Sequence, residues 1–305
     1  MARTAGTQTR QSMKANAAVI TSRENSWLKR FRAALSGERG DNGVLAVEGV
    51  RLVEAALGSR LLVEALLVSE SGARHLPRVA PVLAAEVPVL RISDKLFAGV
   101  ADTRTPQGIA ALVRPRLVTI ETLMTGTPLL VALVGVQDPG NVGTIVRAAE
   151  AFGATGAATC PSEGIGTADP FGPKALRASA GSALRLPIVV GISPTILLAQ
   201  LRLFQVKVYA AVAASEDSKI QAAQAISPLL RPWDVDWQGP AAILIGNEGS
   251  GLPAALVRAA DARVYIPQVA ATAPVGIESL NAAMAASVLL YEALRQRNSA
   301  GQEPT

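Results

Sequence analysis

The 305-residue chain has one cysteine, one histidine and an aromatic content of only 4%. The single Cys160 excludes an internal disulfide and a cysteine-based metal site, and it fits a reducing compartment. No apolar run reaches the roughly eighteen residues that a transmembrane helix requires. We therefore expect a cytoplasmic protein with no metal ion and no membrane partner, whose core consists mainly of alanine, leucine and valine.

Positive charge is concentrated near the start of the sequence. The chain has a net charge of +5, whereas residues 1–39 hold eight basic and two acidic residues, a net +6, so the remainder is nearly neutral. A basic segment on a neutral body predicts a polyanionic partner that is reached by one end of the molecule. A solvated, solubilising tail would have the same composition, and charge patterning favours neither interpretation.

The order of apolar strands and amphipathic helices predicts an α/β protein with two domains. The first half contains a helix, then a strand that runs into a helix, and three further strands (24–35, 43–57, 63–70, 87–93 and 108–115). Strands of the second half are expected at 129–136, 155–160, 185–190, 206–212, 241–246 and 263–267, and helices at 142–153, 173–182, 194–204, 253–260 and 279–296. These later strands are apolar throughout, which is typical of a parallel sheet covered on both faces. The chain is accordingly divided into a basic flexible tail, a front domain, a linker, a second domain and a flexible C-terminus (1–20, 21–115, 116–128, 129–297 and 298–305).

The stretch GVQDPGNVGTIVRAAEAFGA (135–154) follows a strand and opens a helix, as a nucleotide-binding loop would. It lacks the lysine of a P-loop and the glycine spacing of a dinucleotide fingerprint, so both of those functions are excluded. Pro139 and Gly140 form a tight turn instead, and Asn141 is well placed to cap the helix. Arg147 falls on a different face of that helix from the apolar residues, where it is either solvated or able to clamp a phosphate.

Two more loops follow strands of the predicted parallel sheet, where ligand sites of such sheets lie. In AAILIGNEGSGL (241–252), three glycines allow backbone amides to approach a ligand, and Glu248 is either a binding residue or a charge at the next helix N-terminus. In IESLNAAMAASVLLYEALRQR (277–297), Ser279 can cap the last helix and Asn281 lies in its first turn.

Taken in this order, NVGTIVRAAEAFG, LIGNEGSGL and IESLNAAMAASVLLYE resemble the three motifs of the SpoU/TrmH family of RNA ribose methyltransferases, in the SPOUT superfamily. The front half, with VLAVEGVRLVEAAL and TRTPQGIAALV, is similar to the substrate-binding domain that precedes the motifs in many members. The resemblance implies a small, ribosomal-protein-like α/β domain followed by a parallel-sheet α/β domain with a deep trefoil knot. It also implies a homodimer.

Members of this family transfer a methyl group from S-adenosylmethionine to a ribose 2′-hydroxyl. The resemblance implies that the cofactor is held by backbone groups of Leu244, Ile245, Gly246, Gly251, Ile266 and Leu280. The residues that it implies as catalytic or substrate-binding are Asn141, Arg147, Glu248, Ser279 and Asn281. The loop 268–278 is longer than is usual in the family, so its backbone contacts are not carried over.

The reaction is a positioning problem, because a sulfonium methyl is already a strong electrophile. The family proposal makes the arginine a base, but a guanidinium has no acceptor lone pair at pH 7. We expect Arg147 to hold the substrate phosphate and polarise the hydroxyl, while Asn141 orients it; the destination of the proton stays open.

The front domain implies a structured RNA, most of all 23S ribosomal RNA. Transfer RNA is the alternative substrate, and a catalytically silent knotted RNA-binding or assembly factor is the alternative function. Candidate RNA contacts are Arg30, Arg32, Lys174 and Arg177, although Arg177 could equally be a solvated helix residue.

Overall fold

The computed structural model describes residues 17–39, 43–59, 61–115, 117–213, 227–268 and 279–300. The predicted long loop 268–278 lies outside this range, apart from its first residue. No helix of the described part is long and apolar enough to cross a membrane.

The chain divides into two compact units, and neither is continuous in sequence. The first comprises Met1–Leu117 and Phe171–Arg185, and the second comprises Val118–Pro170 and Leu186–Thr305. The segment Phe171–Arg185 was expected within the second domain, but it groups with the first unit. Its buried Ala175, Leu176, Ala183 and Leu184 show that it contributes to a core.

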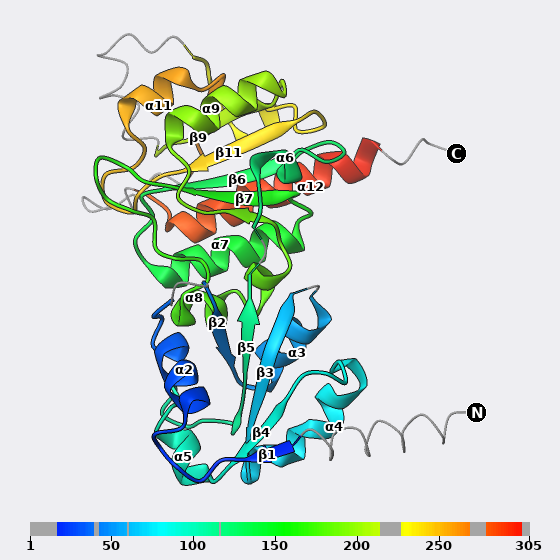
Figure 1. The fold of residues 1–305 in the computed structure, drawn as a ribbon. Helices are drawn as coiled ribbons and strands as arrows, with labels where there is room; N and C mark the ends of the chain where they lie inside the picture. Colours follow the sequence, from blue (N-terminus) through cyan, green and yellow to red (C-terminus); the bar gives the residue numbers. More distant parts are fainter. Residues whose placement is uncertain are drawn as a thin grey trace. The chain divides into compact units, whose positions relative to one another are not determined.

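The first unit is built on a five-stranded sheet with the order β1-β4-β3-β5-β2, in which β5 is antiparallel to its neighbours (Figure 1). The strands are β1 (Ala17–Val19), β2 (Leu45–Glu48), β3 (Leu62–Ser69), β4 (Val89–Ile92) and β5 (Ile109–Arg114). The helices are α2 (Ser26–Leu35), α3 (Val50–Gly58), α4 (Leu76–Val79), α5 (Asp94–Ala98) and α8 (Pro173–Ala178), with 3-10 turns at Ser71–His75, Ala80–Val82 and Ser182–Leu184. Buried residues of α2 and α5 form one core with alternate residues of β3, β4 and β5, as the period of a strand requires.

Three residues of the segment predicted as a tail form strand β1 instead. Ala17–Val19 pairs in parallel with β4, and the Ile20 N–H donates to the Arg91 carbonyl at 2.9 Å. A three-residue strand is too short to show an alternating pattern in the sequence, which is why it was missed.

The second unit contains a seven-stranded, wholly parallel sheet with the order β10-β12-β9-β11-β6-β7-β8. The strands are β6 (Leu129–Val134), β7 (Gly156–Cys160), β8 (Ile188–Val189), β9 (Lys207–Ala211), β10 (Leu229–Leu230), β11 (Ala241–Ile245) and β12 (Ala262–Val264). The helices are α6 (Ile120–Leu123), α7 (Pro139–Ala151), α9 (Pro194–Leu203), α11 (Ala254–Ala259) and α12 (Ala282–Ala300), with a 3-10 turn at Pro232–Asp234. The expected strands of this half are present, and the short β10 was not expected.

Helices cover both faces of this sheet, as its apolar strands require. Residues of α6, α9 and α11 pack in one core with β6, β9 and β11. On the other face α7 and α12 lie side by side (Figure 1). Two predicted boundaries change: α12 continues to Ala300, into the expected C-terminal tail, and the expected linker contains α6, whose Ile120 and Leu123 are buried.

Candidate active site

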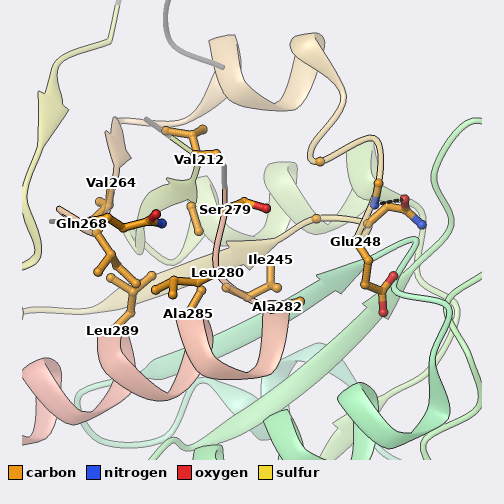
Figure 2. Close-up of a pocket in the computed structure, with 17 residues that line it drawn as sticks. Val212, Ile245, Glu248, Val264, Gln268, Ser279, Leu280, Ala282, Ala285 and Leu289 are labelled. Carbon is orange, nitrogen blue, oxygen red and sulfur yellow. Dashed lines mark hydrogen bonds between the residues drawn. The ribbon is translucent and has the colours of Figure 1, made fainter. Parts of the chain in front are cut away.

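Loops that follow β9, β11 and β12 meet at one edge of the parallel sheet and enclose a cavity of about 250 Å³ (Figure 2). Its walls combine apolar side chains, such as Val212, Val264 and Leu289, with the glycine-rich loop after β11. Five of the six predicted cofactor residues line it: Ile245, Gly246, Gly251, Ile266 and Leu280. The sixth, Leu244, does not line the cavity, because its side chain is buried in the core on the other face of the sheet.

Asn247 shapes the glycine-rich loop. Its backbone forms a reciprocal pair with Gly251, with two hydrogen bonds of 3.0 Å. Its side-chain oxygen accepts from the N–H groups of Gly249 and Ser250, while its amide donates to the Gly135 carbonyl at 2.8 Å. The loop is therefore closed on itself and tied to the end of β6.

Gly246 is required by a close approach of the backbone. A Cβ atom at this position would lie 2.3 Å from the carbonyl carbon of Gly251, closer than real Cβ contacts allow. The chain can fold the loop back beside the strand only because this residue has no side chain.

We expect Gly246→Ala to weaken S-adenosylmethionine binding about 5- to 150-fold. The added methyl group forces the loop away from the strand, and such overpacking costs about 1–3 kcal/mol. Isothermal titration calorimetry measures the affinity, and thermal unfolding reports the stability of the same protein. Gly239→Ala is the matched control, since a Cβ there meets no atom within 4 Å; equal affinities of the two variants would contradict the prediction.

The Glu248 carboxylate lies at one end of the cavity and joins two loops (Figure 2). It accepts hydrogen bonds from the N–H groups of Gln137 and Asp138, at 3.1 and 3.2 Å, and from the Asn141 amide at 2.8 Å. Burial by itself raises the pKa of Glu248, but these donors outweigh it and hold the pKa below its ordinary value. The group is therefore an anion that organises donors, not a proton donor at neutral pH.

Asn141 and Asn281 continue this chain of hydrogen bonds. Because the Asn141 amide nitrogen donates to Glu248, its oxygen is left to accept from the Asn281 amide at 3.0 Å. The Asn281 oxygen in turn accepts from the N–H groups of Ala283 and Met284 at the start of α12. Each amide thus has one consistent orientation, fixed by the carboxylate at one end and the helix N-terminus at the other.

Both predicted helix caps are corrected by this geometry. Asp138, not Asn141, caps α7, and its side chain accepts from the Gly140 N–H. Pro139 then occupies the first helical position, where its fixed φ and missing N–H cost nothing, and Asn141 is free to face Glu248. Asn281, not Ser279, caps α12, because the helix begins only at Ala282.

The remaining predicted catalytic residues are placed differently. Ser279 lines the cavity beside Leu280 (Figure 2). Arg147 is an exposed residue of α7 that does not line the cavity, and its side chain makes no hydrogen bond or ion pair with any described residue. Four of the five residues are therefore brought together, and Arg147 stands apart on its helix with its guanidinium available.

The predicted RNA contacts all lie in the first unit. Arg30 and Arg114 share the carboxylate of Glu64, and Arg30 also stacks over the Trp27 ring at 4.8 Å. Arg32 donates to the Gly99 carbonyl at 3.3 Å. Arg177 forms an ion pair with Asp102 at 2.6 Å, and the Lys174 side chain is exposed.

Sequence reasoning missed the role of Asn247. The signal was present, since asparagine in a glycine-rich loop commonly bonds backbone groups two residues on. It also missed Gln268 and Val212, which line the cavity. Nothing in their local sequence marks them, because only the pairing of β9 with both β11 and β12 brings them to the site.

Metal-ligating side chains do not cluster in the described ranges: no group of three His, Cys, Asp or Glu residues there could hold an ion. Cys160 is buried at the end of β7, and burial raises the pKa of its thiol to about 12. Its thiolate is therefore negligible at neutral pH, and the residue acts as a small apolar core residue.

Known proteins share both halves of this arrangement. Residues 128–291 match the SpoU rRNA Methylase family, and residues 33–111 match the MRM3-like substrate binding domain. The chain is 33% identical over 254 residues to the 23S rRNA (guanosine(2553)-2′-O)-methyltransferase RlmP of Bacillus subtilis. The aligned region covers 83% of this chain and 90% of the relative. It is 30% identical over 305 residues to the 23S rRNA (uridine(2479)-2′-O)-methyltransferase of Streptomyces viridochromogenes, with 98% of each chain covered.

A solved structure agrees with the sequence matches. The rRNA methyltransferase from Sinorhizobium meliloti with bound AdoMet superimposes with a TM-score of 0.72 at 28% identity, over 92% of this chain and 98% of that chain. The family match covers more than half of the sequence and includes the cavity, Asn141, Glu248 and Asn281. The chain therefore belongs to the SpoU rRNA methylase family, and it is a methyltransferase that takes its methyl group from S-adenosylmethionine.

Proposed function

We propose that this protein methylates a ribose 2′-hydroxyl of 23S ribosomal RNA. The observation that carries the proposal is the hydrogen-bonded chain of Glu248, Asn141 and Asn281 at one end of a cavity walled by apolar side chains and a glycine-rich loop. A methyl donor in the cavity and a ribose beside Asn141 would then meet at the end of the sheet.

The residues of the cavity fit an adenosyl cofactor. Val212, Val264 and Leu289 offer an apolar surface for a base, and the glycine-rich loop leaves backbone groups accessible because few side chains cover them. The bound cofactor supplies an electrophilic methyl group. We propose Ile245, Gly246, Gly251, Ile266 and Leu280 as the residues that hold it, with Leu244 contributing only through the backbone that precedes them.

Asn141 is proposed to orient the ribose hydroxyl. Its amide cannot turn, since a turn would place two donors or two acceptors face to face at both Glu248 and Asn281. Ser279, which lines the same cavity, offers a hydroxyl that can donate or accept next to the reacting groups. The site is therefore arranged before substrate binds, which is what a positioning reaction needs.

Arg147 is proposed to hold the RNA phosphate next to the reacting ribose. It is exposed, and no described residue neutralises it. A guanidinium presents two parallel N–H groups that match two phosphate oxygens. A guanidinium has no acceptor lone pair, so Arg147 polarises the hydroxyl and does not accept its proton.

The choice of ribosomal RNA rests on the relatives, several of which carry 23S rRNA in their names. The first unit, which resembles a substrate-binding domain, would grip the RNA through Arg30, Arg32 and Lys174, with Arg177 held in place by Asp102. A bacterial enzyme of this kind would act in the cytoplasm. Transfer RNA remains the alternative substrate and a silent binding factor the alternative function.

The test is a methyl-transfer assay with unmethylated ribosomal and transfer RNA. S-adenosylmethionine with a radiolabelled methyl group is incubated with each RNA, and labelled 2′-O-methyl positions are mapped. Label at one position of large-subunit RNA would support the proposal, and label in transfer RNA alone would replace the substrate. No label with intact cofactor and RNA binding would favour the silent factor.

We also propose that the second unit contains a trefoil knot, as the family resemblance implies. Its support is the strand order, in which β11 lies between the earlier β6 and β9 and the last strand β12 lies between β9 and β10.

A homodimer formed through α12 is proposed as the working state. Met284, Val288 and Tyr291 are 59, 42 and 55% exposed, and their spacing places them along one stripe of the helix. We expect light scattering to give the mass of a dimer at micromolar protein, and Val288→Glu to shift it toward the monomer because it places a charge in the interface. Ile196→Glu, at an exposed apolar position of α9, is the control; a monomeric wild-type protein would refute the dimer.

A further inference from the structure

A second hollow lies in the first unit, at the edge of its sheet. It has a volume of about 580 Å³ and is formed where β1 and β4 end and α5 begins. Its lining includes Ile20, Thr21, Ser93 and Leu96, together with the charged residues described next. We call this hollow the β1–β4 groove.

The β1–β4 groove gathers positive charge. Arg23, Arg91 and Lys95 line it, against one carboxylate, Glu70. All three cations are exposed, and none of them makes a hydrogen bond or an ion pair through its side chain with a described residue. Like charges that share a groove repel one another, so an anion bound there would relieve that repulsion.

Four other arginines of this unit have a different environment. Arg30 and Arg114 share Glu64, Arg78 donates two hydrogen bonds to Glu54, and Arg177 pairs with Asp102. Internal carboxylates thus satisfy those side chains. The three cations of the β1–β4 groove lack such partners in the part of the chain that the structure describes, and they line one hollow together.

The backbone holds these cations in register. Val19 pairs with Arg91, and the Ile20 N–H donates to the Arg91 carbonyl, so the chain that leaves β1 carries Arg23 along the end of β4. Ser93 accepts from the Leu96 N–H, which leaves its own hydroxyl hydrogen available to a ligand. The groove is therefore formed by paired strands and offers hydroxyl donors beside its cations.

We propose that the β1–β4 groove binds consecutive phosphates of the RNA substrate, away from the methyl-transfer site. The inference rests on the proposed function in one respect, namely that the polyanion is RNA. An open groove with three unpaired cations fits a run of phosphodiesters, whose charges are evenly spaced along the strand. It also gives a function to strand β1, which supplies Val19 and leads into Arg23.

The test measures how RNA binding depends on salt. The triple variant Arg23→Gln, Arg91→Gln, Lys95→Gln is compared with wild-type protein, using a transcript of large-subunit ribosomal RNA as the probe. Each phosphate contact contributes about 0.7–0.9 to the slope of log affinity against log salt, so the slope should become shallower by about 2. Thermal unfolding of the variant should match that of the wild type, which shows that the first unit is folded. Affinity for S-adenosylmethionine, measured by calorimetry, should stay unchanged because the cofactor cavity lies in the second unit.

A second triple variant removes the same charge elsewhere. Arg78→Gln, Arg202→Gln, Arg258→Gln takes three exposed cations from outside the groove and should keep the wild-type slope. Equal slopes for the groove variant and wild type would overturn the groove and leave the proposed function intact. RNA binding without methyl transfer by the wild-type protein would overturn the proposed function, and the comparison of the salt slopes would still decide on the groove. Tighter binding of duplex DNA than of RNA by the groove would overturn the assignment to RNA.

Discussion

Arg147→Lys should lose at least 100-fold in methyl transfer while S-adenosylmethionine binds as in the wild type. Lysine keeps the charge but replaces a planar fork that can bind two phosphate oxygens with a single rotating ammonium. Removing one aligned donor from a developing anion typically costs a factor of about 100–1000 in rate. Arg147 does not line the cofactor cavity, so the affinity for the cofactor is the internal standard.

The matched control is Arg258→Lys, the same replacement at an exposed position of α11. It should retain wild-type turnover in the same assay. Wild-type turnover in Arg147→Lys would show that this residue does not clamp a phosphate. A loss of cofactor affinity as large as the loss of turnover would show a structural effect instead.

Glu248→Gln should lower turnover about 10- to 100-fold. The carboxylate accepts from three donors, whereas a glutamine has one oxygen and must point its NH₂ group at a donor. Asn141 cannot turn to compensate, because its oxygen already accepts from Asn281, whose own oxygen caps α12. An unsatisfied donor costs about 1–3 kcal/mol, and about 1.4 kcal/mol is a factor of ten in rate.

The pH dependence of stability tests the hydrogen bonds that Glu248 accepts. The folded protein lowers the pKa of Glu248 below 4.5, so its stabilising effect is complete above that pH and is lost as the pH falls through the lower folded value. Glu248→Gln should therefore show a smaller loss of stability on acidification than the wild type in thermal unfolding. Glu86→Gln, at an exposed position of the first unit, should follow the wild type; identical acid profiles for both variants would contradict the assignment.

Much of the second unit could be predicted because its strands carry long apolar runs and its loops carry glycine. The apolar run before Gly135 became β6, and the run before Gly246 became β11, at the expected positions. The rule that ligands bind beyond the carboxyl ends of parallel strands then directed the prediction to the end of the sheet where the cavity lies. The cavity formed there contains five of six predicted cofactor residues.

The errors came from choices that local sequence leaves undecided. DPGN contains two good capping residues, and the structure selects Asp138 because Pro139 fits the first helical position. Likewise, Ser279 and Asn281 could each cap the last helix, and hydrogen bonding to the distant Asn141 decides between them. The partner of Arg177 lies 75 residues earlier in the chain, and no periodicity predicts such an ion pair.

The discontinuous first unit has a consequence for how the protein is made. Gly181 has a positive φ, and a Cβ there would lie 2.6 Å from that of Ala55, so the segment Phe171–Arg185 is fitted closely against α3. During synthesis this surface of α3 stays uncovered until the ribosome has added more than a hundred further residues. A gene fragment that stops at the end of β5 would encode an incomplete unit, so exchange of the substrate-binding region between relatives requires two matched insertions.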